Sequence, residues 1–217
     1  MKIVLPGGTG QVGGILKRAL TAAGHQVVVL TRRPVRDSEI EWDGRTLGPW
    51  ADAIDGSDVV INLAGRSVSC RYTDENLRAM MDSRVDSARV VGEAIAGART
   101  PPRVWLQMST ATIYAHRSDA PHDEATGVIG GTESGVPGYW AFSVEIAKSW
   151  EREQERAETP HTRKVALRSA MVMSPDRGGV FDHLLWLARL GLGGPVAGAR
   201  STCPGSTTTT SFARWSS

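Results

Sequence analysis

The chain has 217 residues, of which 41% are hydrophobic and 22% are charged, and its formal net charge is +2. This length is enough for one large domain with a substantial core, or for one domain plus a fragment of a second. A net charge so close to zero gives no reason to expect binding to nucleic acid or to an anionic membrane. No apolar stretch approaches the length of a membrane span.

The two cysteines, Cys70 and Cys203, are far apart and form neither a C-x-x-C pair nor a metal-ligand spacing. We therefore expect no metal site, and two free thiols in the reducing cytoplasm. The first apolar run has only three residues before Pro6, which is too short for a secretory leader. The sequence thus predicts a cytoplasmic protein.

The most informative segment is residues 7–14, which read Gly-Gly-Thr-Gly-Gln-Val-Gly-Gly. It follows the apolar run Ile3–Leu5 and opens a helical pattern over Gln11–Ala23. Its glycines satisfy both the G-x-G-x-x-G and the G-x-x-G-x-x-G spacing, which lets backbone amides at a helix N-terminus approach a pyrophosphate. The alternative is a glycine-rich loop that merely turns the chain. The predicted dinucleotide-binding residues here are Gly7, Gly8, Thr9, Gly10, Gln11, Val12 and Gly13.

Strand-like and helix-like segments alternate along the chain. After the first unit we expect strands at 26–30, 40–42, 58–63, 103–108 and 164–172, and helices at 50–54, 74–98, 140–157 and 181–190. Continuous apolar strands that alternate with helices indicate a mostly parallel sheet covered on both faces. The predicted fold class is therefore α/β, a Rossmann-like, doubly wound sheet over about residues 1–180.

Ligands of such folds lie at the carboxyl ends of the strands. After the second strand come Thr31, Arg32 and Arg33, where an NAD site usually has a carboxylate for the ribose hydroxyls. Two guanidinium groups suit a ribose 2′-phosphate instead, so NADP(H) is favoured over NAD(H). The alternative is a pair of solvated loop arginines.

Small residues and hydroxyls follow the next two strands. Leu63, Ala64 and Gly65 would let the cofactor pass close to the backbone, although Ala64 could equally be small for packing. Ser109 and Thr110 follow Met108, which we also place at the cofactor. A hydroxyl here could hydrogen-bond a reacting oxygen during hydride transfer, with Thr110 the first choice and Ser109 the second. A hydroxyl that bonds its own backbone is the alternative.

Several motifs, taken together, resemble the extended short-chain dehydrogenase/reductases, and more narrowly their NAD-dependent epimerase-like or SulA-related branch. The motifs are GGTGQVGG (7–14), NLAG (62–65), SRV (83–85), STATIYAH (109–116), LRSAMVMSPDRGG (167–179) and RLGLGGPVAG (189–198). The resemblance covers about residues 1–198. It implies a Rossmann-like domain over 1–180, a nicotinamide dinucleotide, commonly NADP(H), and a smaller C-terminal substrate domain that begins within 181–198.

One departure concerns catalysis. The extended enzymes carry Tyr-x-x-x-Lys early in the helix that follows the fifth strand, whereas alignment places Phe142 and Ile146 at these two positions here. Tyr139, Ser143 or a bound water would have to supply the proton. Two functions follow. The first is an NADP(H)-dependent oxidoreductase or epimerase acting on a small hydroxyl- or carbonyl-bearing, sugar-nucleotide-like substrate. The second is a non-catalytic NADP(H)-binding protein that senses redox state or scaffolds a partner, and a homodimer is compatible with either.

The second departure is the aberrant tail, residues 199–217, which has no period and contains four consecutive threonines. Its composition is typical of a disordered tail. A competing hypothesis is a frameshift near residue 199, because a shifted reading frame of the coding DNA could replace family-like residues by this threonine- and serine-rich sequence.

Overall fold

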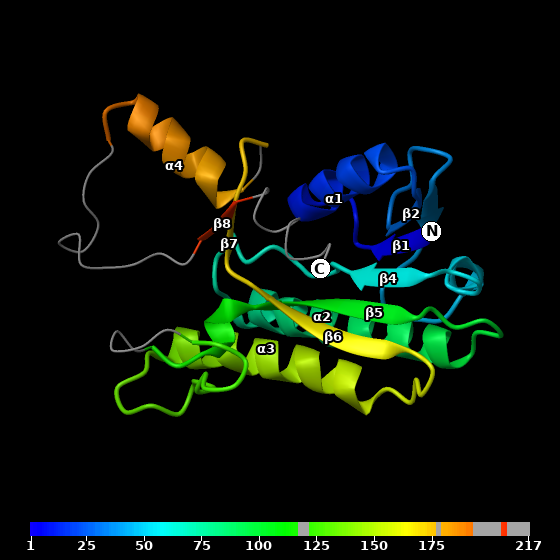
Figure 1. The fold of residues 1–217 in the computed structure, drawn as a ribbon. Helices are drawn as coiled ribbons and strands as arrows, with labels where there is room; N and C mark the ends of the chain where they lie inside the picture. Colours follow the sequence, from blue (N-terminus) through cyan, green and yellow to red (C-terminus); the bar gives the residue numbers. More distant parts are fainter. Residues whose placement is uncertain (117–121, 177–178, 193–204, 208–217) are drawn as a thin grey trace.

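The computed structural model describes residues 1–116, 122–176, 179–192 and 205–207. Six parallel strands form one sheet in the order β3-β2-β1-β4-β5-β6 (Figure 1). The elements of this unit are β1 (Lys2–Pro6), α1 (Gln11–Ala22), β2 (Gln26–Thr31), β3 (Glu39–Glu41), η1 (Pro49–Ala53), β4 (Val59–Asn62), α2 (Asp74–Ala96), β5 (Val104–Thr110), η2 (Ala111–Ile113), α3 (Gly138–Arg156) and β6 (Arg163–Ser169). The predicted fold class, a Rossmann-like parallel sheet, is confirmed.

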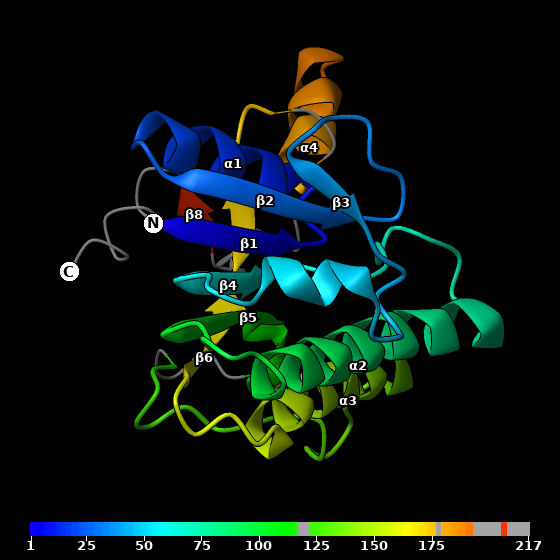
Figure 2. The same ribbon diagram turned by 90° about the vertical axis from the view of Figure 1, so that its right-hand side faces the viewer.

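Helices cover both faces of the sheet, with α1 on one side and α2 and α3 on the other (Figure 2). The strands show why, because successive side chains point to opposite faces. In β1, Val4 belongs to the core cluster that includes α2 residues, whereas Ile3 and Leu5 belong to the cluster that includes Leu16 of α1. Strands that are apolar at every position therefore require a helix layer on each side.

The predicted sixth strand, Lys164–Val172, is wrong in its extent. β6 ends at Ser169, and Met171–Met173 forms β7, which pairs in parallel with β8 (Gly205–Thr207) in a separate two-stranded sheet. The sequence contains no glycine or proline at this point to mark the end of a strand. However, β5 ends at Thr110, which is the partner of Ser169, so β6 has no further strand to pair with.

The chain then continues into α4 (Val180–Arg189), none of whose residues is buried. This helix stands apart from the six-stranded sheet (Figure 1). β8 falls within the segment for which we expect a tail, and the rest of 199–217 lies outside the described residues. Within the described ranges, no helix is long and apolar enough to cross a membrane.

The packing of α2 on the sheet makes one position of that helix sensitive to size. A Cβ at Gly92 would lie 2.7 Å from the Cβ of Ala157 and 3.4 Å from the Trp105 ring. We expect Gly92→Leu to lower the free energy of unfolding by about 1–3 kcal/mol, as overpacking does in close-packed cores. The neighbouring change Glu93→Ala, which removes an exposed ion pair with Arg89, should cost about 0.5 kcal/mol or less. Urea unfolding of both variants measures the difference, and equal losses would contradict this packing.

Candidate functional site

The turn between β1 and α1 is tight where it meets the rest of the molecule and open where a ligand would approach. Gly7 has a φ of 72°, and a Cβ there would lie 2.6 Å from the Cα of Ala64. A Cβ at Gly13 would collide with the carbonyl of Gly8, whereas a Cβ at Gly10 would meet nothing within 4 Å. The bare backbone is therefore required on the inside of the turn, while free space lies in front of Gly10.

The N-terminus of α1 is left without a side-chain cap. Gly10 is the N-cap residue and makes no side-chain hydrogen bond, and the first turn contains no acidic residue. The amides of a first helical turn have no intrahelical partner, and the helix dipole places partial positive charge there. This end of α1 is suited to an anion.

The end of β4 is held against the turn by buried amides. Asn62, which is fully buried, donates to the Oε1 of Gln107 at 3.0 Å and accepts from the amide of Ala64 at 3.1 Å. This pair fixes the start of the predicted segment Leu63–Gly65 beside Gly7. We did not predict the role of Gln107, because nothing in the sequence pairs a β5 side chain with the end of β4.

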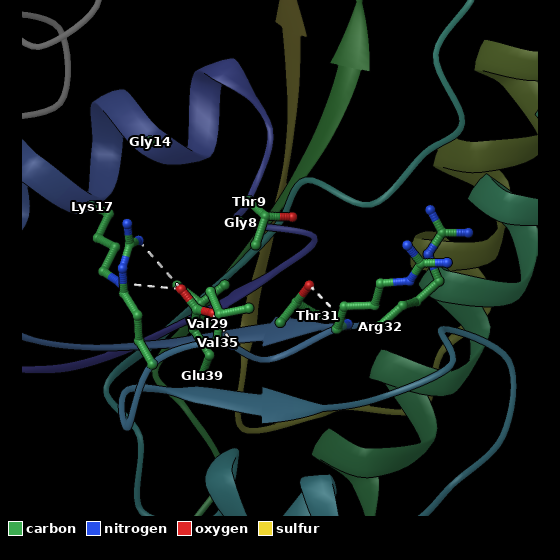
Figure 3. A pocket seen from close by; sticks show the side chains of 11 residues that line it. Gly8, Thr9, Gly14, Lys17, Val29, Thr31, Arg32, Val35 and Glu39 are labelled. Carbon is green, nitrogen blue, oxygen red and sulfur yellow. Dashed lines mark hydrogen bonds and ion pairs between the residues drawn. The ribbon is translucent and has the colours of Figure 1, made fainter.

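A cavity of about 870 Å³ lies between the glycine turn, α1, and the segment that joins β2 to β3 (Figure 3). Five of the predicted residues line it: Gly8, Thr9, Thr31, Arg32 and Arg33. Its other lining residues are Gly14, Lys17, Val29, Val35, Arg36 and Glu39, which we did not predict. Lys17 follows Gly14 by three residues, so helical periodicity could have placed both on one face. Arg36 lies in the loop between β2 and β3, and Glu39 begins β3, so the course of that loop brings both to the cavity and no local sequence signal predicts it.

Glu39 is the one carboxylate in the lining, and its side chain is only 3% exposed. It accepts from the amide of Val35 at 2.9 Å and lies 3.4 Å from Nη1 of Arg36 and 3.7 Å from Nζ of Lys17. The hydrogen bond from Val35 is the largest of the effects that lower the pKa of Glu39, and the two cations add to it. In contrast, the exposed guanidinium groups of Arg32 and Arg33 contact no carboxylate among the described residues.

The two hydroxyls at the end of β5 point to different surroundings. Ser109 is buried and donates to Oε1 of Glu151 in α3 at 2.5 Å. Thr110 is half-buried, and its Oγ1 accepts from the amide of Thr112 at 3.2 Å and lies 3.0 Å from the Thr112 hydroxyl. The Ser109 hydroxyl is thus bound to a carboxylate inside the protein, whereas Thr110 is one of a pair of hydroxyls at the strand end.

An ion pair lies beneath this strand end. Arg168 of β6 donates to both carboxylate oxygens of Glu151, at 2.9 and 2.8 Å, and to the hydroxyl of Tyr114 at 2.9 Å. These hydrogen bonds, with that to Glu151 the largest effect, raise the pKa of the Arg168 guanidinium. Tyr114 also stacks on His122 with ring centroids 4.9 Å apart. We did not predict this network, because its members come from three separate elements.

The other predicted residues are dispersed. Tyr139 is 63% exposed in the first turn of α3, and the hydroxyl of Ser143 donates to the carbonyl of Tyr139 at 2.9 Å. Met108 is half-buried and packs against the core. Within the described parts of the chain, no group of three or more His, Cys, Asp or Glu residues could hold a metal ion.

The segment that follows β7 contacts α1 close to the glycine turn. The side-chain amide of Gln11 donates to the carbonyl of Asp176 at 2.9 Å, and Arg18 pairs with the carboxylate of Asp176 at 2.5 Å. The Ser174 hydroxyl donates to the same carboxylate at 3.1 Å. The part of the chain that leads into α4 is therefore attached to the helix whose N-terminus suits an anion.

Comparison with known proteins identifies relatives of the whole described unit. Residues 3–134 match the family model described as the NAD dependent epimerase/dehydratase family. The epimerase family protein SDR39U1 of Bos taurus is 30% identical over 207 residues, which cover 94% of this chain and 65% of that protein. The chain thus spans about two thirds of the length of this relative.

Two solved structures are similar. The human epimerase family protein SDR39U1 (isoform 2), determined with NADPH, superposes with a TM-score of 0.82 at 28% identity, over 96% of this chain and 66% of that one. The nucleoside-diphosphate sugar epimerase of Corynebacterium glutamicum has a TM-score of 0.75 at 24% identity, over 98% of this chain and 42% of that one, and shows the shared fold.

The ion pair of Glu151 and Arg168 can be tested as a structural support of the β5 end. We expect Glu151→Ala to lower the free energy of unfolding by about 2–3 kcal/mol, because it leaves a partly buried guanidinium and the Ser109 hydroxyl without their acceptor. Glu153→Ala on the same helix removes the pairing with the exposed Arg156 and should cost about 0.5 kcal/mol or less. Urea unfolding compares the two, and a Glu151→Ala loss no larger than that of the control would refute the role.

Proposed function

This chain belongs to the NAD dependent epimerase/dehydratase family, and we propose that it binds NADP(H) for an oxidoreductase or epimerase reaction. The substrate would be a small molecule with a hydroxyl or carbonyl group, of the sugar-nucleotide type. The observation that carries the proposal is the glycine turn, which opens beside a cavity lined by Arg32 and Arg33 at the end of β2, two arginines without a carboxylate partner among the described residues. A homodimer and a cytoplasmic location stay predictions.

The residues present fit a dinucleotide. The open space before Gly10 and the uncapped α1 would take the pyrophosphate at Gly7–Gly13. A cavity of about 870 Å³ is within the size range of small-molecule sites and could take the adenosine half. Leu63–Gly65 and Met108 would lie along the nicotinamide half. When bound, this cofactor would supply or accept a hydride.

The preference for NADP(H) is supported by charge. Thr31–Arg33 at the end of β2 includes no carboxylate to accept hydrogen bonds from a free ribose 2′-hydroxyl. The guanidinium groups of Arg32 and Arg33 are instead available for charge-assisted, bidentate hydrogen bonds to a phosphate. The similar human protein was determined with NADPH.

Thr110 is the residue that we assign to the reacting oxygen. Its Oγ1 accepts from the Thr112 amide and donates to the Thr112 hydroxyl at 3.0 Å. A hydroxyl proton can rotate, so a carbonyl or alcohol oxygen that came close would replace Thr112, a neutral acceptor, as its partner. Ser109 is the second choice, since its proton already goes to Glu151. Tyr139, Ser143 or a water would be the proton donor, and Tyr139 is the most exposed of the protein groups.

A second function, a protein that binds NADP(H) without turnover, is favoured by the residues at the family's Tyr and Lys positions. Phe142 is half-buried and Ile146 is buried in α3, and neither side chain can transfer a proton. Such a protein would sense redox state or scaffold a partner.

Loss of the two arginines should discriminate between the cofactors. We expect the double variant R32A/R33A to bind NADPH about 10–100-fold more weakly, a loss of about 1.4–2.7 kcal/mol, which is the size of one charge-assisted hydrogen bond to the phosphate. NADH lacks the 2′-phosphate, so its dissociation constant should change less than about threefold by the same reasoning. Isothermal titration calorimetry measures both, and an equal effect on the two would exclude a 2′-phosphate site at these residues.

Measurement of catalytic turnover distinguishes the enzyme from the non-catalytic NADP(H)-binding protein. If the chain is an enzyme, Thr110→Val should lower kcat for NADPH oxidation on an active carbonyl substrate by about 10²-fold, the lower end of proton-transfer contributions, and leave the NADPH dissociation constant unchanged. Ser149→Ala is the control, because it removes a hydroxyl of α3 that lies outside the predicted site and donates to Glu145 at 3.2 Å. Saturable NADPH binding with no oxidation across a panel of carbonyl compounds would instead support the binding protein.

A further inference from the structure

The nucleotide cavity has positive charge at two separate ends. Lys17 projects from α1 at one end, close to Glu39, whereas Arg32 lies at the other end, beyond Thr31 (Figure 3). Arg36 belongs to the first end, because its Nη1 lies 3.4 Å from Glu39. A phosphate that entered this cavity would therefore meet two sets of cations.

Among the described residues, a carboxylate compensates the positive charge only at the end formed by Lys17 and Arg36. The carboxylate of Glu39 lies within 4 Å of both Lys17 and Arg36, and its side chain is almost fully buried. Its lowered pKa keeps it ionised at neutral pH. Lys17 is further occupied by a hydrogen bond to the Ser38 hydroxyl at 3.1 Å. The end formed by Lys17, Arg36 and Glu39, which we call the inner end, thus has two cations that are already paired. It also has a carboxylate that would repel an incoming phosphate.

The position of Glu39 in the sheet explains the division. Glu39 begins β3 and is the partner of Val29, whereas Arg32 follows the end of β2. The carboxylate is therefore set back by two residues along β2 from Thr31, the strand end at which ligands of this fold bind. It acts on the inner part of the cavity and leaves the strand end positive.

We propose that Glu39 is a specificity-determining residue, which excludes phosphate from the Lys17 and Arg36 end and directs it to Arg32 and Arg33. The inference rests on the proposed nucleotide function of the cavity. Specificity of this kind comes from a repulsive group as much as from an attractive one. The ligand that this arrangement selects is an adenosine nucleotide whose ribose phosphate lies at the end of β2.

Glu39 also has a structural contact, and the test must separate it from the charge. The carboxylate accepts from the Val35 amide at 2.9 Å, which holds the segment between β2 and β3. Glu39→Gln keeps an oxygen acceptor for that amide and removes the negative charge. Glu41→Gln is the matched control, because it makes the same charge change on the same short strand at an exposed residue outside the cavity lining.

The decisive experiment is a rescue. The probes are 2′,5′-ADP, measured by calorimetry, and inorganic phosphate, measured by its shift of the melting temperature. R32A/R33A should lose 2′,5′-ADP affinity, and R32A/R33A/E39Q should regain about tenfold, because two cations are released at the inner end. In the otherwise unchanged chain, E39Q should bind inorganic phosphate about tenfold more tightly than E41Q does. No rescue, or an equal gain in E41Q, would overturn the proposal.

A second comparison, of Arg36→Ala with Arg32→Ala, tests the proposal if the Glu39→Gln protein does not fold. Arg36→Ala removes a cation that Glu39 already pairs, so the affinity for 2′,5′-ADP should fall less than about threefold, whereas Arg32→Ala should lower it about tenfold or more. Equal losses would refute the division of charge. If the unchanged chain binds neither 2′,5′-ADP nor NADPH, the proposed function fails. The inorganic phosphate comparison of E39Q with E41Q still decides whether Glu39 excludes anions.

Discussion

The constraint on which the rest depends is the close approach of backbone to backbone at the turn between β1 and α1. A Cβ at Gly7 would overlap the end of β4, and one at Gly13 would overlap the carbonyl of Gly8. Without side chains at these positions, α1 packs directly on the strand end and its first-turn amides face the carboxyl edge of the sheet. The same contact sets the position of Ala64, so the segments after β1 and β4 meet at one place. The anion site is thus a result of chain packing and not of any single polar side chain.

Around this backbone the structure distributes charge unevenly. The cavity lining contains four cations and one buried carboxylate, and the carboxylate pairs with only the two at the inner end. At the β5 end, a carboxylate and a guanidinium pair with each other beneath the surface and leave Thr110 with hydroxyl and amide partners. In both places an ion pair determines which polar groups stay without an ionic partner among the described residues. These groups, Arg32, Arg33 and Thr110, all lie at or just after the carboxyl ends of strands.

The sequence predicts the local part of this arrangement well, because each signal lies within one βα unit. The glycine turn, the parallel sheet and the ends of β2 and β5 to within one or two residues all follow from spacing and apolar runs. Glu39, Arg36, Glu151 and Arg168 could not be found in this way, since their partners lie on other elements and no periodicity connects them. The end of β6 was also missed, because no glycine or proline separates Ser169 from Met171 and the break comes from the length of the neighbouring strand β5.

The two halves of the site are therefore built on different principles. The cofactor half is made from consecutive segments of the sheet, so its geometry is rigid and depends on short-range sequence. For the substrate half we predict a domain that begins after β7, where α4 exposes Leu184 and Trp186 and belongs to neither core cluster. The contact between Asp176 and α1 connects these predicted halves, because it joins the segment after β7 to the helix that begins at the glycine turn. Gln11 belongs to the predicted pyrophosphate turn, so one side chain of that turn also holds the segment that follows β7.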